Sequence, residues 1–148
     1  MKRIITILLF LAFVVTVNAK WIESARGGGI IMYVETKMTY DEDGIYYILV
    51  KTVPMKSNLA KERKNLVDAL GSTDYKKYTH SVDQYAVDFN SSQWILISTT
   101  YYGGADIINM ISYNGETDWY KPGYGSLGSE TIATARQLVK NAQRNNSR

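Results

Sequence analysis

Trp94–Tyr102 reads WILISTTYY and is the strongest strand signal in this chain of 148 residues. Its β-branched and aromatic side chains favour an extended backbone, and both faces of the strand are apolar as far as Ser98. The polar run 90–93 precedes the segment and the glycine-containing run 103–106 follows it, so we expect a turn at each end. The segment therefore predicts a strand that is joined to its neighbours by short turns.

The flanking sequence predicts further strands. Alternating apolar and polar residues indicate a strand over residues 30–40, and residues 45–53 form a second after the turn Asp41–Gly44. Strands are also expected over residues 79–89 and 107–113, with a short edge strand at Trp119 and Tyr120. Strands joined by short turns pair antiparallel, because parallel neighbours need long crossovers. The pattern predicts an antiparallel β-meander of about five or six strands.

Two segments carry helical patterns instead. Ser57–Leu70 places its apolar residues near one face and is followed by Gly71, which favours a helix end. The second helix begins at Gly128-Ser129, with Ser129 as the expected cap. Its apolar stripe consists of Ile132, Ala135, Leu138, Val139 and Ala142. The predicted fold class is therefore α+β, with a C-terminal helix packed on the sheet and a second helix inserted mid-chain.

Several of the expected strands are apolar on both faces, whereas the C-terminal helix covers only one face of a sheet. The second face needs the Ser57–Leu70 helix, a curled sheet or another chain to cover it. This surplus of apolar surface is the basis for a hypothesis that the protein forms a homodimer.

Met1–Ala19 has the parts of a secretory signal peptide, namely basic residues at positions 2 and 3, an apolar run over 4–17 and a cleavage site ending at Ala19. The apolar run is too short to remain as a membrane span, and no cysteine follows it to carry a lipid. We expect residues 1–19 to be removed and residues 20–148 to form a single exported domain without a membrane span. Its expected location is the periplasm, the cell surface or the medium.

Charge gives little indication of a nucleic-acid partner. The whole chain has 17 basic and 14 acidic residues, but Lys2 and Arg3 belong to the expected signal peptide, which leaves 15 basic residues in the exported part. So small an excess does not indicate nucleic-acid binding. Cysteine is absent, which excludes a disulfide, a thiol nucleophile and a cysteine-based metal site.

The motifs that resemble catalytic or cofactor sites lack their required context. Gly123–Gly128 matches GxGxxG, but no following strand supplies the acidic residue of a dinucleotide site. Asp41–Gly44 lacks the longer ligand series of a calcium loop, and a hairpin turn is the better interpretation. His80 is the single histidine and has no nucleophile tied to it by spacing. We therefore expect no enzyme activity, no metal and no cofactor.

The order of segments from Ser81 onward resembles the surface-adhesin protein E family, a group of small exported bacterial proteins. The resemblance rests on Val87-Asp88-Phe89, Trp94–Tyr102, Trp119, Pro122, Gly128-Ser129 and the closing helix. In that family a strand ends in an Asp-Cys pair, and a disulfide joins it to the C-terminal helix. Here Asp88 is present, but Phe89 takes the place of the cysteine, and the helix partner falls near Val139. The resemblance implies apolar packing where the family has a disulfide.

The same resemblance implies a non-enzymatic binding protein, because named members are adhesins that bind host matrix and plasma proteins. Binding of host matrix proteins or glycans is accordingly the first expectation. The alternative is a periplasmic envelope protein that binds an apolar ligand or a partner subunit.

Candidate binding residues come from uneven charge and from tyrosines. Residues 51–80 have a net charge of +4, whereas residues 81–128 have −4, so the basic stretch is a candidate docking patch for an acidic protein or glycan. Tyrosine brings large contact area at low entropic cost, and tyrosines that flank glycine turns are expected to be exposed. The predicted binding residues are Lys61, Arg63, Lys64, Tyr75, Lys76, Lys77, Tyr78, Tyr101, Tyr102, Tyr120 and Tyr124.

Overall fold

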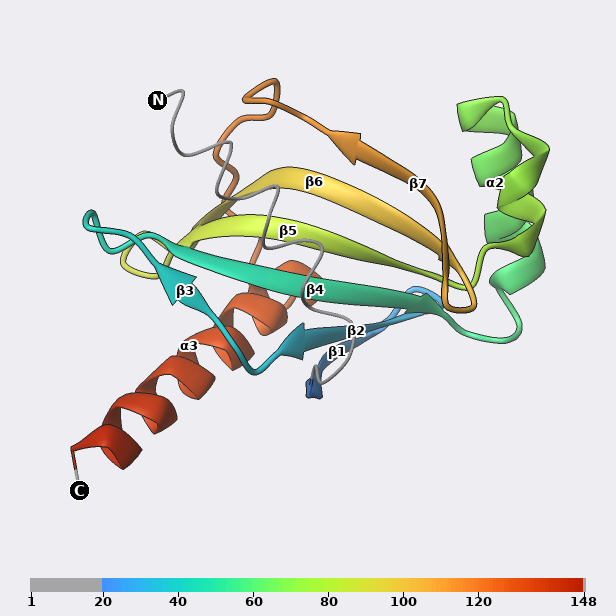
Figure 1. Ribbon diagram of the computed structural model, residues 1–148. Helices are drawn as coiled ribbons and strands as arrows, with labels where there is room; N and C mark the ends of the chain where they lie inside the picture. Colours follow the sequence, from blue (N-terminus) through green and yellow to red (C-terminus); the bar gives the residue numbers. More distant parts are fainter. Residues whose placement is uncertain (1–19, 148) are drawn as a thin grey trace.

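One antiparallel sheet organises the computed structural model, which describes residues 20–147 (Figure 1). Six strands follow one another across it in the order β1-β2-β4-β5-β6-β7, and the short β3 pairs with β4. Their bounds are β1 Trp21–Gly27, β2 Ile30–Glu35, β3 Thr39–Tyr40, β4 Tyr46–Pro54, β5 His80–Asp88, β6 Gln93–Gly103 and β7 Asp106–Ser112. The predicted α+β class and the antiparallel meander are confirmed.

The main difference from the expected strands lies at the start of the sheet. β1 had not been predicted, and it pairs along most of its length with β2. The strand expected over residues 30–40 is divided into β2 and β3, and both parts pair with β4. The expected edge strand at residues 119–120 is a single bridge between Tyr120 and Trp94. The signal peptide predicted for residues 1–19 lies outside the described residues.

Helix α3 (Leu127–Asn146) covers one face of the sheet by packing on β1 and β2. Figure 1 shows it running obliquely beneath the strands, with its C-terminal end projecting past β3. Its cap is Ser126, whose hydroxyl accepts a hydrogen bond from the Ser129 backbone N–H, so the predicted cap at Ser129 was wrong. No helix within residues 20–147 is long and apolar enough to cross a membrane.

The main core lies between α3 and the sheet. Its fully buried members include Val34, Ile48, Val50 and Val87 from the strands and Ile132 and Ala135 from the helix. Residues directly opposite each other on neighbouring strands share a face. Val34 pairs with Val50, which pairs with Asp83, so all three lie on the face that α3 covers in part, which we call the helix face. The opposite side, which contains Tyr33, Lys51 and Val82, we call the open face.

The second helix stands at the end of the sheet away from the C-terminus of α3 (Figure 1). Helix α2 (Leu59–Leu70) contacts the 3₁₀ helix η1 (Thr73–Lys77), and none of its residues is fully buried. Gly71 ends it in a left-handed conformation, as the sequence predicted. The 3₁₀ helix had not been predicted, and it inserts the buried Tyr75 against the helix face of β6.

Phe89, which takes the place of the family's cysteine, packs at the end of β5. Its half-buried ring contacts the core and lies 4.9 Å from the ring of Tyr46. From α3 it is Arg136 that reaches this site, where the guanidinium lies 5.8 Å from the Phe89 ring and donates a hydrogen bond to the Phe89 carbonyl oxygen. Arg136 lies three residues before Val139, one turn earlier on the helix.

Gly128, near the start of α3, packs closely against Trp94 of β6 and Pro122. A Cβ atom at this position would lie 2.8 Å from the Trp94 indole and 3.1 Å from the ring of Pro122. We expect Gly128→Ala to lower the free energy of unfolding by about 1–3 kcal/mol in urea titrations, because neither rigid ring can move aside easily. Gly123→Ala is the control, since nothing lies within 4 Å of its added methyl group, and we expect a change below about 0.5 kcal/mol. Equal effects at both glycines would contradict the packing argument.

Candidate functional site

The predicted basic residues do not all have the same role. Lys61, Lys64, Lys76 and Lys77 are exposed on α2 and η1. Lys64 forms an i,i+4 ion pair with Asp68 on the same helix. Arg63 is half-buried and its Nε donates a 2.8 Å hydrogen bond to the Tyr78 carbonyl oxygen. Arg63 therefore ties α2 to the following segment, and the lysines alone remain available to a partner.

The predicted tyrosines separate into buried and exposed groups. Tyr75 and Tyr78 are buried, at 2% and 3% exposure, and both pack edge-on against Tyr101. The Tyr75 hydroxyl also accepts a hydrogen bond from the Asn109 side chain. These contacts attach η1 to β6 and β7, so the buried rings of Tyr75 and Tyr78 have a structural role. The expectation that Tyr101 and Tyr102 are exposed was wrong, because Tyr101 is half-buried and Tyr102 is buried.

Tyr120 and Tyr124 are exposed, as predicted, at 60% and 106%. Tyr120 lies beside Trp94 near the start of β6, whereas Tyr101 and Tyr102 lie near its end. The tyrosines therefore do not combine into one binding surface.

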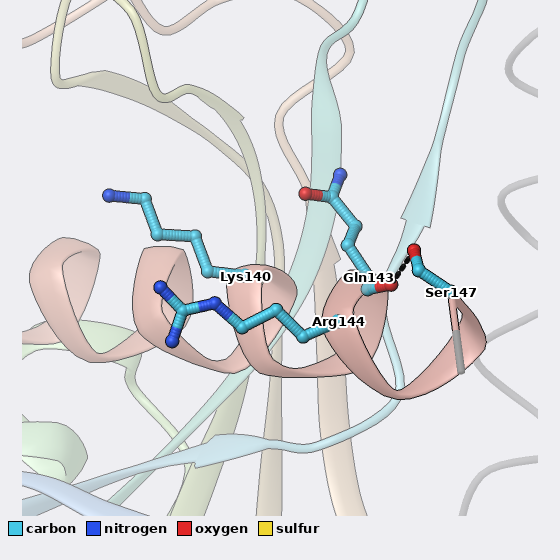
Figure 2. A pocket seen from close by; sticks show the side chains of 4 residues that line it. All are labelled: Lys140, Gln143, Arg144 and Ser147. Carbon is cyan, nitrogen blue, oxygen red and sulfur yellow. Dashed lines mark hydrogen bonds between the residues drawn. The ribbon is translucent and has the colours of Figure 1, made fainter.

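A shallow hollow lies along the last turns of α3, and Lys140, Gln143, Arg144 and Ser147 line it (Figure 2). All four residues belong to the exposed C-terminal end of α3 or its cap, and one internal hydrogen bond joins the Ser147 hydroxyl to the Gln143 carbonyl oxygen. A hollow that is walled by a single helix gives little enclosure, so we do not assign binding to it.

The open face carries an aromatic cluster around a lysine that the sequence reasoning missed. The Lys51 Nζ lies 4.7 Å from the Trp21 ring centroid and 5.3 Å from that of Tyr33. The three residues come from β4, β1 and β2, and all are half-buried. Burial lowers the pKa of Lys51, and no carboxylate among residues 20–147 forms a salt bridge with it. The rings supply the main stabilising contacts of this ammonium group.

His80 and Tyr102 extend this cluster across the sheet. They are directly opposite each other on β5 and β6, and their rings stack in parallel at 4.8 Å. Burial lowers the pKa of His80, and the positive charge of Lys51 lowers it further. We call the five residues Trp21, Tyr33, Lys51, His80 and Tyr102 the Lys51 cluster.

Apolar side chains surround the Lys51 cluster. Leu49 and Val53 flank Lys51 on the same face of β4, and Ile31 on β2 lies opposite Val53. Near the edge strand, Ile107 and Met110 are exposed at 54% and 38%, and they lie opposite Tyr102 and Thr100. In the part of the chain that the structure describes, no helix packs across this face. A mixed apolar and aromatic surface without cover is typical of a protein-binding surface.

A second charged group lies inside a strand, on the helix face. Asp83 is opposite Thr99, whose hydroxyl donates a 2.6 Å hydrogen bond to Asp83 Oδ1. Burial raises the pKa of Asp83 to about 6, and the Thr99 hydrogen bond opposes that rise. The pKa of Asp83 is thus higher in the folded state than its ordinary value of 3.8, so the folded state binds this proton more tightly.

This shift predicts a pH-dependent effect of Asp83→Asn. The stabilisation from protonation of Asp83 is complete below about pH 4 and is lost as the pH rises through about 6. We expect Asp83→Asn to raise the free energy of unfolding at pH 7.5 by about 1–2 kcal/mol, allowing for partial exposure, and to have a smaller effect at pH 4.5. Urea titrations at both pH values measure it, with the exposed Asp106→Asn as control. A loss of stability at pH 7.5 would contradict the burial argument.

Sequence reasoning passed over Lys51 and Asp83 although a signal was present. Lys51 directly follows the apolar run Ile48–Val50 in its strand, and Asp83 is a charged residue in the middle of a strand, a place where charge is uncommon. Trp21 and Tyr33 gave no comparable signal. Within residues 20–147, no three potential ligands of the His, Cys, Asp or Glu type come together as a metal site would require.

Comparison of the chain with protein-family models, with curated proteins and with solved structures found no match.

Proposed function

We propose that the protein is an exported, non-enzymatic binding protein that docks a partner protein on the open face of its sheet. The observation that carries this proposal is the Lys51 cluster, a half-buried ammonium group held between the rings of Trp21 and Tyr33. Such a cation, without a salt bridge to any described carboxylate, favours a partner that brings a carboxylate to it. The surrounding aromatic residues are those that dominate binding energy in protein interfaces.

We also propose that the protein is a member of the surface-adhesin protein E family. This assignment rests on the segment order from Ser81 onward, and it makes host matrix proteins the first partners to test, with matrix glycans after them. Export rests on the signal-peptide pattern of residues 1–19.

A second candidate is a periplasmic envelope protein that binds a partner subunit or an apolar ligand. The observation in its favour is the row of apolar residues near the open-face edge, which includes Ile107 and Met110. Under this alternative, a second copy of the chain is one candidate for the partner subunit, and the protein would then be a homodimer.

The test of the docking surface is surface plasmon resonance against a panel of immobilised extracellular-matrix proteins. The protein is expressed from its full-length sequence, and Lys51→Gln is compared with Lys61→Gln, the same change on the exposed face of α2. We expect Lys51→Gln to weaken binding about tenfold, or 1.4 kcal/mol, and Lys61→Gln to change it less than twofold.

The competing surface is tested in the same experiment by changing Lys61, Lys64, Lys76 and Lys77 together to Gln. Loss of binding in that variant, with normal binding of Lys51→Gln, would move the site to α2 and η1 and reject the open face. Absence of binding to the whole panel would reject a matrix protein as the partner.

Cellular location separates the two candidate functions. Protease is added to intact cells, and a periplasmic protein serves as the marker that must stay whole. Digestion of the protein would place it on the surface, as an adhesin requires, whereas protection would favour the periplasmic alternative.

A further inference from the structure

The middle of the helix face contains a carboxylate without a counter-ion. Asp83 lies between Val50 on β4 and Thr99 on β6. Thr99 bonds its Oδ1 atom, and within residues 20–147 neither a hydrogen bond to Oδ2 nor a salt bridge to Asp83 is present. The side chain is partly exposed, so a ligand from solvent can reach it. A partly buried carboxylate is usually paired, and this one is not paired within the described chain.

Aromatic rings surround this carboxylate. Tyr85 follows Asp83 on the same face of β5, and Tyr101 follows Thr99 on the same face of β6. Burial raises the pKa of both phenols, and the negative charge of Asp83 raises the pKa of each further. Tyr78 lies next to β5, where burial, Glu62 and Asp83 all raise its pKa, to about 12. Each of these rings therefore lies within the electrostatic field of Asp83.

The groups near this cluster carry charges of both signs, but no described cation forms a salt bridge with Asp83. Tyr113 follows β7 and lies close enough to Tyr85 and Tyr101 to affect both, and Asn109 on β7 adds a neutral amide. From α2, Glu62 acts on Tyr78, and the guanidinium of Arg63 is bound to the Tyr78 carbonyl oxygen. Lys51 and His80 point to the open face. The helix face at Asp83 thus presents a carboxylate and aromatic rings, without a cation bound to the carboxylate among the described residues.

A carboxylate beside several aromatic rings favours an organic cation. The ring faces carry negative potential and attract an ammonium group, and the carboxylate adds a charge-assisted hydrogen bond. We propose that Asp83, with the half-buried Tyr85 and Tyr101, forms a binding site for an alkylammonium group, supplied by a partner's lysine side chain or by a free amine. The site lies on the opposite face from the Lys51 cluster and stands independently of the docking proposal.

Titration by heteronuclear NMR with n-butylamine tests this site, and n-butanol serves as the uncharged probe of similar shape. The amine should shift the backbone signals of Asp83, Thr99 and Tyr101 in a saturable manner, whereas butanol should not. Asp83→Asn should weaken amine binding at least tenfold, and Asp106→Asn on the exposed edge strand should leave it unchanged. Equal affinity in Asp83→Asn, or equal shifts with butanol, would overturn the proposal.

The wild-type protein gives a second test that requires no variant to fold. With the pKa of Asp83 at about 6, the ionised fraction and hence the affinity for n-butylamine should fall about tenfold between pH 7 and pH 5. The phenols that surround it do not contribute, because burial raises the pKa of Tyr78 and Tyr101 to about 12. Affinity that is constant over this range would also overturn the proposal.

A lysine-containing peptide distinguishes the two sources of the ammonium group. N-acetyl-lysine methylamide is titrated beside n-butylamine, with Asp83→Asn as the common control. Tighter binding of the peptide assigns the site to a partner's side chain, and tighter binding of the amine assigns it to a small ligand. Failure of both to bind would reject the site.

Discussion

Trp94→Ala should lower the free energy of unfolding by about 3–5 kcal/mol, the largest effect that we expect from any single substitution. The indole is 8% exposed and stacks on Tyr85, with ring centroids 4.1 Å apart. It also faces Gly128 at the start of α3, and its backbone forms the bridge to Tyr120. Removal of the ring leaves a cavity between β6, β5 and α3. The side chain of Tyr120 does not fill this cavity, because it is exposed to solvent.

Urea denaturation of Trp94→Ala and Trp119→Ala gives the comparison. Trp119 is 44% exposed, so the same chemical change there should cost less than about 1 kcal/mol. Both variants retain two tryptophans, which allows fluorescence to follow unfolding in each. Similar losses in the two variants would mean that Trp94 does not form the described stack.

Ile132→Ala should destabilise the protein by about 2–5 kcal/mol, because it removes the central contact of α3 with the sheet. Ile132 is 2% exposed and belongs to the core with Met32 and Val34 of β2. Its neighbour Thr131 is fully buried, and the hydroxyls of Thr131 and Ser24 on β1 lie 3.0 Å apart. This polar contact fixes the helix position, so the neighbourhood cannot collapse fully into the space that is left.

Ile107→Ala is the matched control for this prediction. Ile107 is 54% exposed at the edge of the sheet, and its truncation should change stability by less than about 0.5 kcal/mol. Thermal and urea denaturation measure both variants. Ile132→Ala with near wild-type stability would show that α3 is not docked on β1 and β2 as described.

The two proposed binding surfaces depend on which residues share a face of the sheet, and β-bulges decide this. Trp94 is opposite Val87, and Thr99 is opposite Asp83, so both lie on the helix face although they are five positions apart. Simple alternation would place them on opposite faces. Between Gln84 and Tyr85 the pairing register shifts, because β6 contains one extra residue there. This β-bulge returns Thr99 and Tyr101 to the helix face, on which Asp83 lies.

The amino-acid sequence by itself determined the meander. Apolar strand segments such as Trp94–Tyr102, the turns Asp41–Gly44 and 90–93, and the amphipathic C-terminal helix are local patterns, so local propensity and side-chain period specify them. Gly71 likewise ended its helix because glycine adopts the left-handed conformation at no steric cost. The pairing of β1 was not visible, because residues 21–27 mix polar and apolar side chains and gain their order only from β2.

Only the tertiary structure decided what the charged and aromatic residues do. Tyr101 and Tyr102 are adjacent in sequence, yet one packs on Tyr75 and the other stacks on His80 across the opposite face. Lys51 lies near Trp21 and Tyr33 because their three strands pair side by side. The neighbours of Asp83 likewise come from β4 and β6, the strands on either side of β5. The physical reason is that strand register and bulges, which are set by long-range pairing, place a side chain on one face or the other.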